Sequence, residues 1–384
     1  MARAAPDIVV AGHICLDVIP TFPGEVPDPL CVPGTLVEVG GPLMSTGGAV
    51  SNVGLALHRL GMSTRLIGKV GDDLFGRAIG DILGEHDRML AESLIVDPED
   101  ASSYTIVVNP PGVDRSFFHA PGANSTFRPS EVDPGRVEGA RVFHFGYPPL
   151  MERTFVDGGE ALASLFAEIR RRGVAVSLDM AQYDPASKAG QADWLAFLRR
   201  VLPEVDVFGP SLGETLAMLG ETMRQPATGG GLIDLADRLL RMGPALVVFK
   251  LGADGLFLRS TGDASRVGQV PALQLGDRWC RRTLLHGGFE VDVVGTTGAG
   301  DCALAALLAA MVKERSPEEA LRDASAVGAC SVERTDATSG VPAWPVVQRR
   351  LQEGWPQRPV DLELDGWTWR EDERLWSGPP RTPT

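Results

Sequence analysis

Short apolar runs alternate with longer stretches of helical periodicity through most of this sequence. A short apolar run predicts a buried strand, and apolar positions spaced three and four residues apart predict a helix. The predicted strands are 8–11, 141–145, 174–179, 205–208, 246–250 and 256–259, and the predicted helices are 155–172, 194–201, 213–219, 233–242 and 302–312. This alternation predicts an α/β fold in which helices flank both faces of a mainly parallel central sheet.

The segments from about 13 to 45 and from about 100 to 122 have a different pattern. The first is rich in proline and glycine and alternates weakly over 36–39. The second alternates over 103–108 and 115–119, around the turn residues Asn109-Pro110-Pro111-Gly112. Short alternating runs separated by turn signals are typical of hairpins. We therefore expect a small β lid inserted into a larger domain that occupies residues 1–344.

The residues from 345 to 384 form a C-terminal extension rich in proline and tryptophan. Four of the seven tryptophans lie in it, namely Trp355, Trp367, Trp369 and Trp376. Such side chains can dock on the domain or on a second subunit. The alternative is a partly ordered extension without chemistry.

Composition and charge exclude several classes of function. The chain has 384 residues, of which 44% are hydrophobic, and this suffices for an ample core. The net charge is −14 and no long basic run is present, so we expect no nucleic-acid partner. The five cysteines are scattered without zinc-ligand spacing, which indicates reduced thiols. No apolar run reaches membrane-spanning length and no signal core is visible, so we expect a cytoplasmic protein without a membrane partner.

A glycine-rich turn precedes the most apolar of the predicted helices. Residues 294–301 read Val-Gly-Thr-Thr-Gly-Ala-Gly-Asp, and a strand-like segment, 289–294, leads into them. The first turn of a helix offers unpaired N–H groups and the positive end of a dipole, so this turn favours an anion. Asp301 in that turn suits a proton acceptor beside a bound phosphoryl group. The spacing matches neither the phosphate loop of P-loop enzymes nor the dinucleotide fingerprint.

Other glycine-punctuated segments accompany this turn. Residues 47–61 begin with a glycine pair, continue as an amphipathic helix that carries Asn52, and end at Gly61. Residues 67–76 contain a third such segment, and 121–124, 207–214 and 250–255 contain further ones. Together these segments resemble the signatures of the PfkB family of carbohydrate kinases, which have the ribokinase-like fold. The resemblance extends from about Asp7 to about Pro342.

The resemblance implies an ATP-dependent kinase that uses Mg²⁺ and phosphorylates a hydroxyl, expected to be a primary alcohol, of a sugar or a sugar-like molecule. Asp301 would be the general base, and the N–H groups of Gly298, Ala299 and Gly300 would form the anion hole. Glu214 would be linked to the metal. The implied nucleotide-binding residues are Ser211, Lys250, Gly252, Ala253, Gly255 and Thr296. The implied acceptor-binding residues are Asp17, Gly47, Gly48, Asn52 and Asn124, with Arg115, His119 and Tyr147 as further contacts.

Several of these residues also have ordinary structural interpretations. Asp301 is a suitable helix cap, and Ser211 with Glu214 forms a capping-box pattern. Lys250 either contacts phosphate or is an exposed lysine at a strand end. Relatives have Asn at the position of Ser211 and often Asp at that of Gly295, which weakens side-chain contacts there but leaves the backbone hole intact.

Two other functions remain open. Some relatives phosphorylate nucleosides, so a nucleoside kinase is one alternative, and a non-catalytic sugar or nucleotide sensor that keeps the fold without the chemistry is the other. Relatives often pair through their lid strands, so a homodimer through the β lid is a further expectation.

Overall fold

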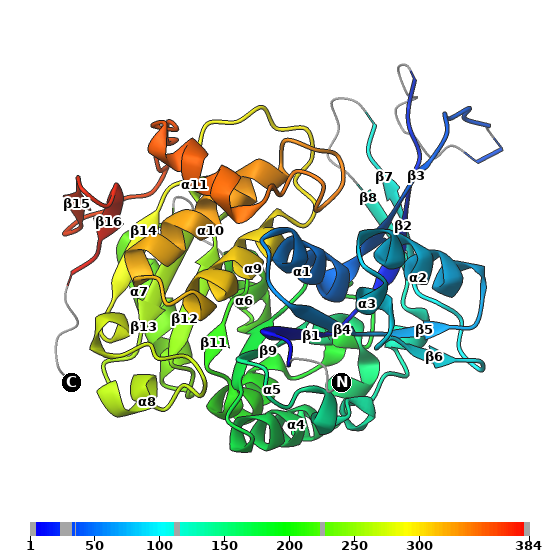
Figure 1. The fold of residues 1–384 in the computed structure, drawn as a ribbon, viewed down its shortest axis with the longest axis horizontal. Helices are drawn as coiled ribbons and strands as arrows, with labels where there is room; N and C mark the ends of the chain where they lie inside the picture. The colour runs from blue at the N-terminus through cyan, green and yellow to red at the C-terminus, as the bar shows by residue number, and fades with distance from the viewer. Residues whose placement is uncertain (1–4, 24–32, 35, 111–115, 223–226, 380–384) are drawn as a thin grey trace.

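The computed structural model describes residues 5–23, 33–34, 36–110, 116–222 and 227–379. Arg115, an expected acceptor contact, lies outside these residues. The central strands are β1 (Ile8–Gly12), β4 (Thr64–Ile67), β9 (Val142–Gly146), β10 (Ala175–Asp179), β11 (Val207–Phe208), β12 (Leu246–Lys250), β13 (Leu256–Ser260), β14 (Thr283–His286), β15 (Thr368–Arg370) and β16 (Leu375–Ser377). They form one ten-stranded sheet in the order β15-β16-β14-β13-β12-β11-β10-β9-β1-β4 (Figure 1).

The direction of the strands divides this sheet into two parts. Neighbours from β4 to β12 pair in parallel. Neighbours from β12 to β15 pair antiparallel. The prediction of a mainly parallel sheet is confirmed for the part in which strands and helices alternate along the sequence.

Helices cover both faces of the sheet, as predicted. They are α1 (Gly48–Arg59), α2 (Leu74–His86), α3 (Arg88–Ala91), α4 (Glu160–Arg171), α5 (Trp194–Val201), α6 (Leu212–Met218), α7 (Gly229–Leu240), α8 (Ala264–Gly268), α9 (Ala299–Val312), α10 (Pro317–Ser331) and α11 (Trp344–Gln352). Because side chains alternate along a strand, Ile8 and Val10 of β1 pack in the core that includes α1, α9 and α10. Val9 and Ala11 pack in the core that includes α4, α5 and α7.

The buried helix α9 explains the long apolar run of the sequence. Every residue of α9 from Asp301 onward is buried, and α9 packs between α1 and α10. A helix that is apolar on all sides is expected at such a central position. The helix therefore presents its N-terminus, with Asp301, at a fixed place in the molecule.

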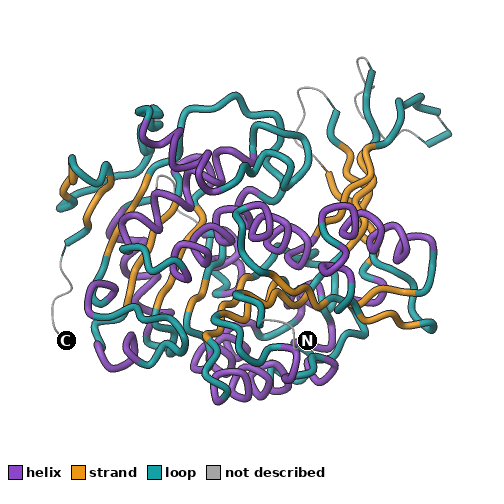
Figure 2. Tube along the Cα trace, in the orientation of Figure 1, coloured by secondary structure: helices purple, strands orange, loops and turns teal. Residues whose placement is uncertain are grey.

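A second sheet projects from the body as the lid, with the strand order β3-β2-β7-β8 (Figure 2). Its strands are β2 (Cys15–Ile19), β3 (Leu43–Gly47), β7 (Tyr104–Val108) and β8 (Ser116–Ala120), and a small third sheet pairs β5 (Lys69–Gly71) with β6 (Ile95–Asp97). The expected strand at 36–39 was wrong, because the partner of β2 is β3, which leads directly into α1.

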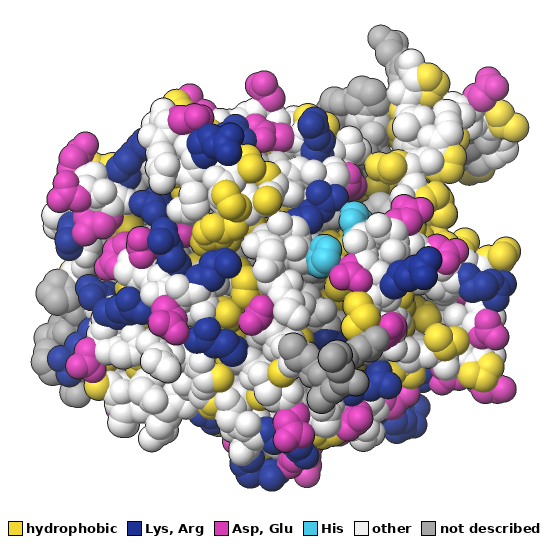
Figure 3. All heavy atoms as spheres, viewed as in Figure 1, with side chains coloured by type: hydrophobic (Ala, Val, Ile, Leu, Met, Phe, Trp, Pro, Cys, Tyr) yellow, Lys and Arg dark blue, Asp and Glu magenta, His cyan; other side chains and the backbone are white. Residues whose placement is uncertain are grey.

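One face of the lid carries an apolar row. Met44, Val18, Ile106 and Phe118 lie opposite one another across the four strands. Phe118 is 56% exposed. On the face of the molecule drawn in Figure 3, charged side chains of both signs are interspersed over the body, and hydrophobic side chains are exposed both at the lid and in patches on the body. The homodimer through the lid stays a prediction, and this row is the surface that it would use.

The C-terminal extension docks on the body. Strand β16 pairs with β14, and β15 pairs with β16. Trp355 is buried and stacks on Phe289 with 4.5 Å between the ring centroids. Of the two interpretations of this segment, docking on the domain agrees with the structure. None of the helices in the described residues is both long enough and apolar enough to cross a bilayer.

Candidate active site

A cavity of about 880 Å³ lies between the lid and the segments that follow β9 and β10. Ligands of parallel α/β sheets bind at this carboxyl edge of the strands. Several of the expected acceptor, metal and anion-hole residues line the cavity, namely Asp17, Gly48, Asn52, His119, Tyr147, Glu214 and Gly298. Segments that lie far apart in the sequence therefore meet at one cavity.

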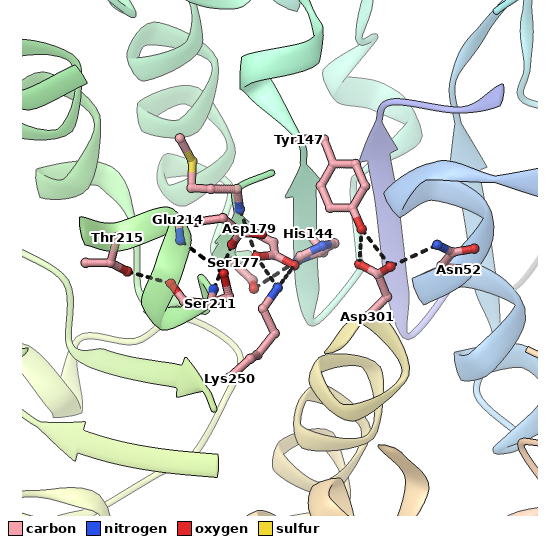
Figure 4. Close-up of polar contacts among 11 residues, drawn as sticks. Asn52, His144, Tyr147, Ser177, Asp179, Ser211, Glu214, Thr215, Lys250 and Asp301 are labelled. Atoms are coloured by element: carbon pink, nitrogen blue, oxygen red, sulfur yellow. Dashed lines mark hydrogen bonds and ion pairs between the residues drawn. The ribbon is translucent and has the colours of Figure 1, made fainter. Parts of the chain in front are cut away.

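Asp301 lies beside this cavity in the first turn of α9 and is 2% exposed. Asn52 Nδ2 of α1 donates a hydrogen bond to Asp301 Oδ2 at 2.9 Å. The Tyr147 hydroxyl lies 2.7 Å from Oδ1 and 2.6 Å from Oδ2 of the same carboxylate (Figure 4). The carboxylate is thus held by side chains from two other segments, which a simple helix cap does not require.

The glycine turn before Asp301 is shaped by close approach of the backbone. Gly298 has φ +71°, and a Cβ at this position would lie 2.4 Å from the Cβ of Ala337. A Cβ at Gly300 would lie 2.8 Å from Cδ of Lys250. At position 298, only glycine combines the positive φ with the absence of a Cβ that would clash with Ala337. At Gly298, which lines the cavity, the turn therefore presents backbone that carries no side chain.

The predicted strand at 289–294 was wrong. Phe289 forms an isolated bridge with Gln357, and residues 290–294 form no regular element. Val293 and Val294 are more than half exposed, so their apolar character does not reflect burial in a sheet. The N–H of Val294 bonds to the carbonyl of Val332, after α10, at 2.8 Å.

Lys250 forms the second polar centre of the site. Its Nζ lies 2.7 Å from Oδ1 and 2.6 Å from Oδ2 of Asp179, at the end of β10 (Figure 4). Burial alone would lower the pKa of Lys250, but Asp179, Glu214 and Asp301 outweigh burial and raise the pKa. Lys250 is therefore a charged ammonium group in the site, and the exposed strand-end interpretation is wrong.

Ser211 and Glu214 form the capping box that the sequence also allowed. Glu214 Oε2 accepts from the N–H of Ser211 at 2.7 Å, and Ser211 Oγ accepts from the N–H of Glu214 at 3.2 Å. Glu214 nevertheless lines the cavity, so its cap does not remove it from the site. The box fixes the direction of the Glu214 side chain.

The charges near Lys250 fit a magnesium ion. Asp179, Glu214 and Asp301 all act electrostatically on this one ammonium group, so carboxylate charge is in excess. Carboxylate oxygens with water are the ligands that Mg²⁺ prefers. The described residues contain no cluster of three or more His, Cys, Asp or Glu side chains arranged as a metal site. Glu214, acting largely through water, is the residue that would hold the ion.

One side of the cavity, where the acceptor-binding residues were expected, contains buried polar side chains from residues 13–52. Asp17 is 8% exposed, and burial raises its pKa to about 6. A Cβ at Gly47 would lie 2.2 Å from Asp17 Oδ2, and a Cβ at Gly48 would lie 2.5 Å from His13 Nδ1. The glycine pair thus leaves room for these two side chains. Buried Asn52 Oδ1 and His13 Nδ1 have no hydrogen-bond partner within the described chain.

Asn124 and the 252–255 turn are not among the described residues that line this cavity. The Asn124 amide is fully buried and pairs with the backbone of Ile14, donating to its carbonyl at 2.8 Å and accepting from its N–H at 3.2 Å. Asn124 therefore orients the segment that contains His13. Gly252, Ala253 and Gly255 form the turn between β12 and β13, where a Cβ at Gly255 would lie 2.1 Å from the carbonyl of His286.

One residue, His13, gained importance only from the structure. It follows β1, and its ring centroid lies 5.1 Å from that of His119. The available signal was a polar residue at the carboxyl end of a buried strand. Asp179 has the corresponding position at the end of β10, where it pairs with Lys250.

The sheet, the lid and the cavity at the strand ends define a ribokinase-like α/β protein. The Arabidopsis thaliana ribokinase structure complexed with ribose and ATP has a TM-score of 0.68 at 22% identity over 91% of this chain and 99% of that chain. A putative ribokinase II from E. coli in complex with ATP and Mg²⁺ has a TM-score of 0.69 at 20% identity, with the same coverage of both chains.

The chain belongs to the pfkB family of carbohydrate kinases, whose model matches residues 5–279 and 281–344. The fructokinase-2 of Zea mays is 28% identical over 351 residues, which cover 88% of this chain and 91% of that protein. The family and the fold predicted from the glycine-rich segments are therefore confirmed. At the level of the family, the protein is a sugar kinase, a phosphotransferase with an alcohol acceptor.

Proposed function

We propose that this protein transfers the γ-phosphoryl group of ATP to a hydroxyl, the primary alcohol, of a sugar or a sugar-like acceptor bound in the 880 Å³ cavity. The observation that carries the proposal is the buried Asp301 carboxylate beside the cavity, which directly follows the Gly-Ala-Gly backbone of residues 298–300. The solved neighbours with ATP, and with ATP and Mg²⁺, support the choice of donor.

The proposed reaction balances as a direct displacement. Asp301 accepts the proton of the acceptor hydroxyl, and the hydroxyl oxygen forms a bond to the γ-phosphorus. The bond from that phosphorus to the β,γ-bridging oxygen breaks, and ADP leaves. The N–H groups of Gly298, Ala299 and Gly300 would stabilise the charge that spreads over the equatorial oxygens. Magnesium, held through Glu214, would neutralise charge on the nucleotide phosphates when bound.

Each side of the site would bind one reactant. Asp17, His13 and Asn52 offer acceptor and donor atoms to a polyol, and two of their buried atoms have no partner among the described residues. Lys250 would contact the nucleotide phosphate together with Thr296, Ser211 and the 252–255 turn. The ammonium group of Lys250, already fixed by Asp179, would reach the phosphate without a large loss of side-chain entropy.

The test is ATP consumption with Mg²⁺ against hexoses, pentoses, sugar acids and nucleosides. One sugar should be turned over with a kcat/KM far above that of the other compounds. If a nucleoside has the highest kcat/KM instead, the protein is a nucleoside kinase. Asp301→Asn should lower kcat about 10³-fold or more while calorimetry still detects acceptor binding. Asp81→Asn, an exposed aspartate of α2, is the matched control.

Two outcomes would contradict this proposal. Asp301→Asn with turnover close to that of Asp81→Asn would refute the general-base role. Acceptor and ATP binding without turnover of any compound would favour the non-catalytic sensor.

A further inference from the structure

Tyr147 is held in a backbone conformation that is unusual for its residue type. It follows β9 and has φ +70°, in the left-handed region. Residues other than glycine occupy this region at a cost of about 1 kcal/mol or more, and such positions cluster at functional sites. Pro148 follows, and the N–H of Tyr147 bonds to the carbonyl of Asp179 at 3.2 Å. The backbone at the ends of β9 and β10 therefore fixes the position from which the Tyr147 side chain leaves the main chain.

The ring of Tyr147 points from this turn to the carboxylate of Asp301 (Figure 4). Its hydroxyl lies within 2.7 Å of both carboxylate oxygens, although the two residues are 154 positions apart in the sequence. Asn52 donates to one of the same oxygens. Burial, and then the charges of Asp301 and Asp179, raise the pKa of Tyr147 well above its usual range. The hydroxyl therefore keeps its proton and acts as a donor.

We propose that Tyr147 is a positioning residue for the general base: its hydroxyl, with the amide of Asn52, holds the Asp301 carboxylate in one orientation and leaves one oxygen to receive the acceptor hydroxyl. A phenol proton satisfies one carboxylate oxygen at a time, so the incoming hydroxyl can replace Tyr147 at one oxygen while Tyr147 stays on the other. The contact also stabilises the ionised carboxylate and keeps it ready to accept a proton. This inference rests on the proposed function.

Other charged groups near Asp301 are unchanged when Tyr147 is replaced. Lys250 from β12, Asp179 from β10 and Glu214 from α6 act electrostatically on this cluster, and Cys302 is the next residue of α9. The substitution Tyr147→Phe removes a single hydroxyl from this set. A change in the kcat of the variant therefore reports the lost hydrogen bond.

The experiment compares Tyr147→Phe with Tyr104→Phe. Tyr104 lies in lid strand β7 and packs on Phe75, so its substitution removes the same hydroxyl away from the cavity. For Tyr147→Phe we expect kcat to fall about 10- to 100-fold, with the KM of the acceptor changed less than about threefold. This division between kcat and KM is expected because the hydroxyl contacts the Asp301 carboxylate and not the acceptor. Tyr104→Phe should keep the wild-type kcat and KM.

A second measurement does not depend on that variant. Absorbance titration of the three tyrosines in the wild type and in Asp301→Asn should show that one tyrosine ionises at lower pH in the variant, because the neighbouring negative charge is gone. A kcat of Tyr147→Phe within twofold of the wild type, or identical tyrosine titrations, would overturn the positioning role. The general base is tested separately: if Asp301→Asn abolishes turnover but Tyr147→Phe behaves like Tyr104→Phe, only the inference about Tyr147 fails.

Discussion

The proposed acceptor side of the site and its proposed nucleotide side are formed by different groups. On the acceptor side, buried side chains converge on the cavity, among them His13, Asp17 and Asn52. On the nucleotide side, the chain offers glycine turns at 252–255 and 295–300, with Val293 and Val294 exposed just before the second turn. Side chains distinguish one arrangement of hydroxyls from another, whereas backbone N–H groups bind any phosphate. Under the proposed function, the choice of acceptor would therefore depend on side chains near the N-terminal end of the sequence.

The supports of the two sides differ as well. The acceptor side is braced locally, since Asn124 pairs with the backbone of Ile14 and the glycine pair at 47–48 admits Asp17 and His13. The nucleotide side is braced from the C-terminal extension, where Trp355 Nε1 donates to the carbonyl of Glu290 at 2.9 Å and Arg358 N–H to that of Gly288 at 2.9 Å. The supports of the two sides therefore lie in different parts of the chain, although Gly298 lines the same cavity as Asp17 and Asn52.

Gly47→Ala should give the largest effect among the variants that separate the two sides. The added Cβ would lie 2.2 Å from Asp17 Oδ2 and would push this carboxylate aside. We expect the KM of the acceptor to rise about 10- to 100-fold while the KM of ATP stays within about twofold. Steady-state kinetics with each substrate varied in turn measures both. Gly268→Ala, at a helical position where nothing lies within 4 Å of the added Cβ, is the control. An equal rise in both KM values would contradict the separation.

Asp17→Asn should stabilise the fold while weakening acceptor binding. Burial raises the pKa of Asp17 from 3.8 to about 6 in the folded protein, so the folded state binds this proton more tightly than the unfolded state does. This proton stabilises the folded state below pH 4, and the stabilisation is lost as the pH rises to about 6. Above pH 7 the free energy of unfolding is therefore lower by up to roughly 3 kcal/mol than it is below pH 4. The variant should therefore gain about 2 kcal/mol in the free energy of unfolding at pH 8, and less at pH 4.5.

Urea unfolding of Asp17→Asn and of the wild type at the two pH values measures this gain. A gain that is the same at both would mean that desolvation of the carboxylate is not its cause. The KM of the acceptor substrate should also rise in the wild type as the pH falls below about 6. Protonation of the Asp17 carboxylate reduces its capacity to accept hydrogen bonds from the substrate hydroxyls.

Trp355→Ala should give the smallest effect, on the nucleotide side alone. Loss of the stacking on Phe289 and of the bond to Glu290 loosens the segment that leads into the glycine turn. We expect the KM of ATP to rise about three- to fivefold with the KM of the acceptor unchanged. Trp369→Ala in β15, at a side chain that is 38% exposed, should leave both values unchanged. If the acceptor KM rises instead, the extension does not act on the nucleotide side.

Local signals in the sequence predicted the body of the fold and the two glycine turns. The helix 194–201 and the strand 246–250 have the predicted bounds, and the capping box of Ser211 and Glu214 is a contact between residues three apart. The failures also had local causes: alternation at 36–39 and the valines of 289–294 suggested strands, but neither segment has a partner strand in the described chain. Alternation alone does not provide a partner.

Local patterns in the sequence do not specify contacts between residues that are far apart along the chain. Tyr147 was expected only as an acceptor contact, and its bond to Asp301 depends on how β9 and α9 lie in space. The pairing of Lys250 with Asp179 likewise depends on the register of three strands. The roles of the site residues themselves stay predictions until the variants are measured.

The pairing of β16 with β14 also bears on how the chain is made. Leu284 and Leu285 of β14 receive their edge partners from Ser377 and Trp376, which are synthesised only after β14 has left the ribosome. Until then the nascent chain carries an unpaired, apolar strand edge, which is a template for association between molecules. A product of premature termination before Leu375 keeps that edge open. Synthesis through β16 is therefore a condition for a protein that does not associate through this edge, even though β15 and β16 lie outside the part that matches the family.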